Sequence, residues 1–293
     1  MSTDLREQAA LIALLRRGGR NWQEIAGAVE RAGSATRVLK DEPDGQDALF
    51  ELEEQFDLSD IEDEITKWRG KGFGFLTLLD ADYPARLRMV HQRPPFLFAN
   101  GTLAPDDLAV AVVGTREPSP RGLSQASAIA EGLAQRGVTV VSGLAKGIDA
   151  AAHRACLDAG GRTVAVIGTG IRRSYPAQNA ELQREIVHKG LVLSQFWPDA
   201  PPTKQSFPMR NAVMSGYALA TVVIEAAYQS GARMQARLAL EHGRHVFLMK
   251  SLLMHEWARE YAQRPNATVV ESAEEVFQGL DGLFPAPDEL VWT

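Results

Sequence analysis

Three short segments of the sequence combine glycines with cationic side chains directly after apolar runs. They contain Gly114 with Arg116, then Ser142, Gly143 and Lys146, then Gly168 and Gly170 ahead of Arg172 and Arg173. Glycine lets the backbone approach an anion closely, and backbone amides at a helix start favour negative charge. One such segment could simply be a tight strand-to-helix turn. Three of them, each with a base, predict a binding site for a phosphate-bearing ligand.

The usual nucleotide-cofactor motifs do not occur in these segments. A Walker loop ends in Gly-Lys-Ser/Thr, which is missing, and Gly168 and Gly170 are followed by Arg173 where a dinucleotide fingerprint has a third glycine. Ser142 and Ser230 lack the context of a nucleophile elbow. The histidines are scattered, and the single cysteine has no partner at metal-ligand spacing. We therefore expect no cofactor and no metal ion.

Asp149 and His153 lie four residues apart, on one face of an expected helix. A hydrolase could use this pair together with Glu225. A histidine near a carboxylate is also common outside active sites, with the carboxylate capping a helix and the histidine bonded locally. We favour the second interpretation and expect no catalytic residues.

The elements that must position these residues alternate along the chain. Near-continuous apolar runs predict strands at 109–113, 138–141, 163–167, 191–193, 221–224 and 245–248. Amphipathic stretches between them predict helices at 121–135, 149–159, 179–189 and 232–241. This order predicts an α/β fold with a Rossmann-like, doubly wound and mostly parallel sheet. Such sheets bind ligands outside the carboxyl ends of their strands, where the glycine segments lie.

The first part of the chain has a different pattern. Helices are expected at 5–17, 22–29 and 35–39, and the acidic run 47–64 is expected to be helical. A strand is expected at 75–79, and Asn100–Gly101 indicates a turn. We expect a small helical N-terminal domain at 1–66, a Rossmann-like domain at 67–283 and a loose tail at 284–293.

Charge is distributed unevenly around a net value of −6. Between Ala109 and Lys250 there are 16 Lys and Arg against 9 Asp and Glu, whereas both flanks are acidic. This asymmetry favours an anionic partner for the middle of the chain. Cys156 is expected to be buried and unreactive. With no signal-peptide core at the start and no membrane-length apolar window, we expect a cytoplasmic protein without a membrane partner.

The glycine segments also carry a family resemblance. The runs Val112–Arg116 and Ser142–Asp149, followed by His153, resemble the DprA/Smf (DNA-processing protein A) family. The likeness continues through residues 163–170, Tyr175–Pro176, Phe207–Asn211, Glu225–Ala226 and Ser230–Gly231, and covers about residues 75–250. The helical N-terminus resembles the SAM-like domain of the family.

The resemblance implies a cytosolic homodimer that binds single-stranded DNA and helps to load the RecA recombinase during DNA uptake or recombination. Arg116, the Ser142–Gly143 turn and Arg210 with Asn211 match positions that contact DNA in the family. Lys146 and Lys204 are added from charge and location, and Gly114, Gly168 and Gly170 as glycines of the loops. Stacking partners for bases are sought among Tyr175, Phe196, Trp197 and Phe207, each of which could equally be part of the core.

The chain departs from the family pattern at Gln195, Ala212, Arg121, Gln235 and the segment 248–250, and the residues after Phe284 are too few for the winged-helix domain of many members. Two alternatives remain. The first is a nucleotide-sensing or nucleotide-processing Rossmann-like domain in stress or anti-phage signalling, which could use the same loops. The second is a protein that only binds other proteins.

Overall fold

A nine-stranded mixed sheet organises the computed structural model, which describes residues 4–41, 57–104 and 107–284. The strand order is β1-β2-β6-β5-β4-β3-β7-β8-β9. The bounds of the strands are β1 Gly74–Thr77, β2 Phe96–Gly101, β3 Ala109–Val113, β4 Thr139–Ser142, β5 Thr163–Val166, β6 Leu191–Ser194, β7 Ala220–Val223, β8 His245–Met249 and β9 Ala267–Val270. The pairs β1–β2 and β2–β6 are antiparallel. All other neighbouring strands in this order pair in parallel.

The order of the strands reverses between β3 and β7. From β3 the chain moves outward through β4, β5 and β6, then returns to place β7 on the other side of β3 and continues to β8 and β9. Because crossovers between parallel strands are right-handed, helices before and after this return cover opposite faces of the sheet. The predicted Rossmann-like, doubly wound sheet is confirmed. Its ligand crevice is expected where β3 and β7 diverge.

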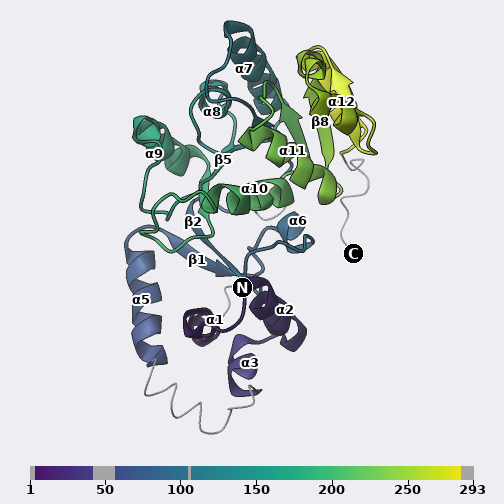
Figure 1. Cartoon of the computed structure of the whole chain (residues 1–293). Coiled ribbons are helices and arrows are strands. Elements are labelled where there is room, and N and C mark those ends of the chain that lie inside the picture. The colour runs from purple at the N-terminus through teal and green to yellow at the C-terminus, as the bar shows by residue number, and fades with distance from the viewer. Residues whose placement is uncertain (1–3, 42–56, 105–106, 285–293) are drawn as a thin grey trace.

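Helices cover the sheet in two groups (Figure 1). On one side α7 packs against α8 and α8 against α9, and on the other α10 packs against α11. α12 packs against β9, and α13 packs against both α7 and β9. The bounds are α6 Ala85–Arg88, α7 Pro120–Gln135, α8 Ile148–Asp158, α9 Ala180–Lys189, α10 Ser206–Tyr217, α11 Gly231–Glu241, α12 Glu256–Ala262 and α13 Ala273–Asp281, with short 3₁₀ turns at Ala177–Asn179 and Lys250–Met254.

Four N-terminal helices gather next to β1 (Figure 1). They are α1 Leu5–Arg17, α2 Trp22–Ala32, α3 Ala35–Asp41 and α5 Leu58–Gly70. Asn21 begins α2 with a capping box: its side chain accepts from the Glu24 amide, and Glu24 accepts from the Asn21 amide. The proposed domain boundary at residue 66 falls inside α5. Of the expected helix at 47–64, residues 47–56 lie outside the described residues.

An aromatic cluster joins these helices to the sheet. Trp197, in the loop after β6, stacks on Phe96 of β2 with ring centroids 4.9 Å apart, and its edge meets Trp22 at 6.5 Å. Trp68 of α5 lies 4.9 Å from Phe98. Aromatic pairs in such geometry add to the free energy of burying their apolar area. The helical region is therefore packed firmly against β1 and β2.

The expected turn at Asn100–Gly101 is wrong. Both residues continue β2, which pairs with β6, and Gly101 has a φ of +118°. A Cβ on Gly101 would lie 2.4 Å from the Gly190 carbonyl oxygen, so this glycine permits close approach of β2 to the connection between α9 and β6. The 3.6-residue pattern also failed to reveal α10, whose residues are buried almost throughout. No helix of the described residues is long and apolar enough to span a membrane.

Candidate functional site

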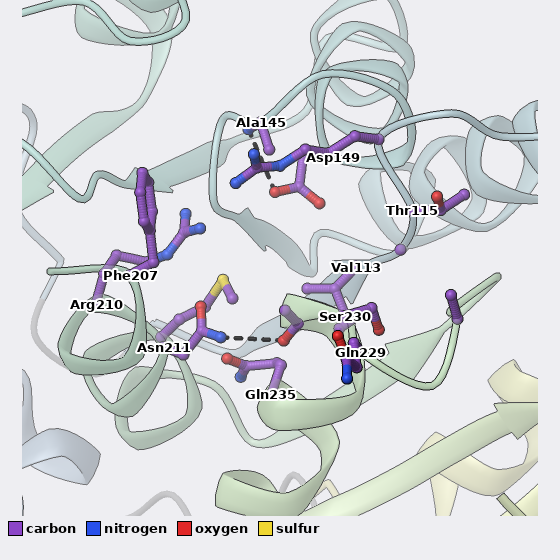
Figure 2. Close-up of a pocket in the computed structure, with 16 residues that line it drawn as sticks. Val113, Thr115, Ala145, Asp149, Phe207, Arg210, Asn211, Gln229, Ser230 and Gln235 are labelled. Carbon is purple, nitrogen blue, oxygen red and sulfur yellow. Dashed lines mark hydrogen bonds between the residues drawn. The ribbon is translucent and has the colours of Figure 1, made fainter. Parts of the chain in front are cut away.

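The crevice between β3 and β7 contains a pocket of about 430 Å³ (Figure 2). Its wall is formed by the segments after both strands and by the facing sides of α10 and α11. Two further hollows adjoin it, and Arg116 and Phe207 line all three. Eight of the ten predicted site residues line this group of hollows: Gly114, Arg116, Gly143, Lys146, Gly168, Lys204, Arg210 and Asn211.

Arg116 and Phe207 form the centre of an exposed rim. The Arg116 guanidinium carbon lies 5.5 Å from the centroid of the Phe207 ring, a cation–π contact. Tyr175 also contacts Phe207, with ring centroids 5.9 Å apart, and 44% of the Tyr175 surface is exposed. A cationic side chain next to exposed rings is the arrangement that single-strand binders use to hold a phosphate and a base together.

Two lysines extend the rim on either side. Lys146 follows the glycine loop after β4 and lines the same hollow as Tyr175, and Lys204 precedes α10 and lines the hollow toward α11. Both lysines and Arg116 are exposed. Among the described residues, no carboxylate lies within ion-pairing distance of any of the three. Their positive charge is therefore available to a ligand.

Beneath the rim, the glycine loop after β4 is fastened by a buried carboxylate. Asp149 Oδ2 accepts hydrogen bonds from the backbone amides of Gly143, at 3.2 Å, and Ala145, at 3.3 Å. Figure 2 shows the bond from Ala145. Asp149 thus ties down the preceding loop, where we had expected it to cap its own helix. Burial raises the pKa of Asp149, and the positive charge of Arg210 opposes this rise.

Arg210 belongs to this buried layer. Its side chain reaches from α10 below the glycine loop, where Nη1 donates to the Val166 carbonyl oxygen at 2.9 Å. A Cβ on Gly143 would lie 1.7 Å from Nη1, so the loop passes directly over the guanidinium. Burial lowers the pKa of Arg210, and the carboxylate of Asp149 counteracts this effect. Arg210 is 7% exposed and touches the hollows through a small part of its surface.

The residues considered for hydrolysis are all engaged in packing. His153 is fully buried, and its Nδ1 lies 2.7 Å from Thr163 Oγ1 on β5. Burial, together with the charge of Arg210, lowers its pKa to about 3, so the ring is neutral. Glu225 accepts from the amide and hydroxyl of Ser119, the residue that caps α7. The three side chains therefore serve different structural contacts.

The remaining predicted residues shape the loops. Gly114 is held against α8, since a Cβ there would lie 2.4 Å from Ile148 Cγ1. Ser142 is fully buried and donates to the Val112 carbonyl oxygen at 2.6 Å. Gly170 packs against the backbone of Trp197 and lies behind the lining of the hollows. A DNA contact by Ser142 or Gly170 stays a prediction.

Asn211 ties α10 to α11. Its Nδ2 donates to the Gly231 carbonyl oxygen at 3.1 Å (Figure 2). Gln235, a departure from the family pattern, is buried on α11, where its side-chain amide donates to the Asn211 carbonyl oxygen and accepts from the Ser215 amide. Ala212 is buried on α10. These two departures therefore fall in the packing of α10 on α11, where Gln235 also lines the crevice.

The aromatic candidates divide into two pairs. Tyr175 and Phe207 lie at the hollows, whereas Trp197 is part of the cluster that binds the N-terminal helices, with Arg16 over its ring. Phe196 is half-buried beside it. The structure also adds Tyr228, Arg233 and Arg237 to the lining, residues that the sequence did not single out. The spacing of the two arginines, one helical turn apart after Ser230–Gly231, was the available signal.

No group of three or more His, Cys, Asp or Glu side chains in the described parts of the chain is arranged to hold a metal ion. The arrangement of the site instead offers cations, exposed rings and a polar crevice.

Known proteins are similar to this chain in sequence. The family described as DNA recombination-mediator protein A matches residues 74–281. Protein Smf of Synechocystis is 42% identical over 178 residues, 59% of this chain and 45% of its own length. The DNA processing protein DprA of Bacillus subtilis is 32% identical over 220 residues, which is 74% of each chain. The chain thus spans about half to three quarters of the length of these relatives.

Solved structures agree in fold. DprA from Streptococcus pneumoniae superposes with a TM-score of 0.76 at 31% identity, covering 95% of this chain and 98% of that one. A Helicobacter pylori DprA structure, described as giving insight into single-stranded DNA binding, has a TM-score of 0.64 at 25% identity and covers 73% and 97%. The match over the glycine loops, the sheet and the crevice confirms the resemblance seen in the sequence: the chain belongs to the DNA recombination-mediator protein A family.

Proposed function

We propose that this protein binds single-stranded DNA at the rim formed by Arg116, Phe207, Tyr175, Lys146 and Lys204. The observation that carries the proposal is the contact of exposed Arg116 with half-buried Phe207, a pair shared by three adjoining hollows at the crevice of the sheet. Cations would follow the phosphate backbone, and the rings would stack on bases. Stacking requires unpaired bases, which favours a single strand over a duplex.

The relatives support the same reading. The related Helicobacter pylori protein is described by its single-stranded DNA binding, and its sheet superposes on this one. By this likeness we further propose that the protein acts in the cytoplasm as a homodimer, and that it assists the loading of a RecA-type recombinase. Since Asp149, His153 and Glu225 are occupied by structural contacts, we propose that binding proceeds without catalysis.

Arg116→Ala tests the site. Fluorescence anisotropy with labelled oligothymidylate of increasing length, at several salt concentrations, gives affinity and its salt dependence. Loss of one phosphate contact on a single strand should reduce the slope of log K against log salt by about 0.7 and weaken binding several-fold. Because Arg116 is exposed, its loss should change the free energy of unfolding by less than about 0.5 kcal/mol.

Lys189→Ala is the matched control. Lys189 is an exposed cation at the end of α9, beside the amino end of β6 and so at the opposite edge of the sheet. The Lys189→Ala variant should bind oligothymidylate with the affinity of the wild type. Equal binding by Arg116→Ala and Lys189→Ala would rule out the proposed site. Displacement of the strand by a mononucleotide would instead favour a nucleotide sensor.

A further inference from the structure

The hollow between Lys204 and α11 has a volume of about 490 Å³ and its own chemistry. Its lining contains the cations Lys204, Arg233 and Arg237 and the rings of Tyr228 and Tyr261, in addition to Arg116 and Phe207. The described residues that line it include no carboxylate. Arg237 pairs with Glu241 along α11 at 2.8 Å, which leaves Arg116, Lys204 and Arg233 as the cations of this hollow without a carboxylate partner among the described residues.

Tyr228 and Arg233 form a second cation–aromatic pair. The guanidinium carbon of Arg233 lies 4.2 Å from the centroid of the Tyr228 ring, and Nη1 donates to the Tyr228 carbonyl oxygen at 3.1 Å. Ser230 fixes the start of this helix by accepting from the Arg233 amide at 3.1 Å. Hydrogen bonds to and from the local backbone therefore position Arg233 next to the Tyr228 ring, although the pair is not buried.

One face of the Tyr228 ring is covered by Arg233, yet the residue remains 59% exposed. Tyr228 lies in the segment after β7 and lines the hollow. An exposed aromatic side chain that a guanidinium orients toward a cationic hollow serves no evident packing purpose. It matches the stacking surface on which single-strand binders place a base.

The two pairs belong to one continuous surface. Arg116 and Phe207 line this hollow as well as the crevice, so the Arg116–Phe207 pair and the Tyr228–Arg233 pair open into the same space. A single phosphate chain could pass from one ring to the other along Lys204 and Arg116. Acidic peptides would use the cations but not the rings, so the combination favours a nucleic acid strand.

We propose that the Tyr228–Arg233 pair is a second base-stacking subsite, which binds another nucleotide of the strand held at Arg116 and Phe207. This inference rests on the proposed function and specifies it: the ligand is a strand that occupies both pairs at once, with Arg233 facing a phosphate or the stacked base. A mononucleotide would reach only one pair.

The test compares two strands of about twelve nucleotides, oligothymidylate and an abasic strand of the same length. Tyr228→Ala should weaken binding of oligothymidylate about 5-fold or more, since stacking requires a base, and should leave binding of the abasic strand unchanged. Tyr228→Phe keeps a ring and should restore affinity. The ring is exposed, so an unaltered melting temperature of each variant serves to exclude misfolding.

The outcomes separate the two claims. If Tyr228→Ala binds oligothymidylate like the wild type while Arg116→Ala binds it weakly, the second subsite is wrong and the proposed site stands. If Tyr228→Ala weakens both strands equally, stacking by this ring is also overturned. If the wild type binds neither strand, the proposed function fails together with the subsite.

Discussion

The polar side chains at the carboxyl edge of the sheet form two layers that differ in what they contact. In the upper layer, Arg116, Lys146 and Lys204 are exposed and have no described carboxylate partner. In the lower layer, Asp149 and Arg210 are buried, and their hydrogen bonds go to backbone atoms of the loops and of β5. The upper layer can meet a ligand, whereas the lower layer sets the shape of the loops that carry it.

This difference shows why a cation in a family motif does not by itself identify a phosphate contact. Arg116 and Arg210 were both predicted to bind DNA, and both line the crevice. Arg210 nevertheless uses its guanidinium beneath Gly143 and against Val166. Substituting the two arginines should therefore have different consequences for folding.

The largest expected effect is that of Arg210→Ala. It removes the positive charge that favours the buried Asp149 carboxylate, along with the donor to Val166, and should destabilise the fold by about 3 kcal/mol. Urea unfolding followed by circular dichroism measures this loss. Arg116→Ala, measured alongside, should unfold like the wild type, and equal stability of both variants would contradict the division into two layers.

The second prediction concerns pH and His153. Burial lowers the pKa of His153 from 6.5 to about 3, so between these values the unfolded chain takes up a proton that the folded chain does not. Unfolding then becomes more favourable as pH falls, by at most about 1.4 kcal/mol per pH unit for this one proton. Stability should decrease from pH 6.5 downward.

His153→Gln isolates this contribution. Glutamine can still donate to Thr163 but does not titrate, so the stability of the variant should fall less steeply between pH 6.5 and 4. The raised pKa of Asp149 and the lowered pKa of His242 act on both proteins alike and cancel in the difference. Parallel pH profiles for the two proteins would show that His153 is not held neutral.

The third prediction concerns Gly143→Ala, which should destabilise the fold less than Arg210→Ala does. A Cβ at this position would overlap Arg210 Nη1, and displacing the guanidinium should cost about 1–3 kcal/mol. Gly231→Ala is the matched control, because a Cβ there meets nothing within 4 Å. Thermal unfolding of the two variants measures the difference, and two equal melting temperatures would mean that the loop has room to move off Arg210.

Prediction from sequence succeeded where local pattern and position coincide. The run Ala109–Val113 is apolar throughout because both faces of β3 are covered, and the strand was predicted at its observed bounds. β9 was missed although its sequence, ATVV, is the same as that of β7, and only Val270 among its residues is buried. α10 was missed because the continuous burial of residues 210–217 removes the amphipathic period.

The site divides in the same way. The rule that ligands bind at the carboxyl ends of strands was sufficient to bring Arg116 and Lys146 to one place. The burial of Arg210 could not be inferred, because its hydrogen-bond partner Val166 lies 44 residues away along the chain. The sequence around Tyr228 and Arg233 is that of an ordinary loop and helix, and only the fold shows that both residues line the hollow.

The reversal of strand order between β3 and β7 divides the binding surface between two halves of the chain. Arg116 and Lys146 come from the half that builds β3 to β6, and Phe207, Tyr228 and Arg233 come from the half that adds β7 to β9. Neither half carries the surface alone. A DNA strand bound to both halves would link them across the middle of the sheet. Binding of DNA should therefore increase the free energy of unfolding of the domain.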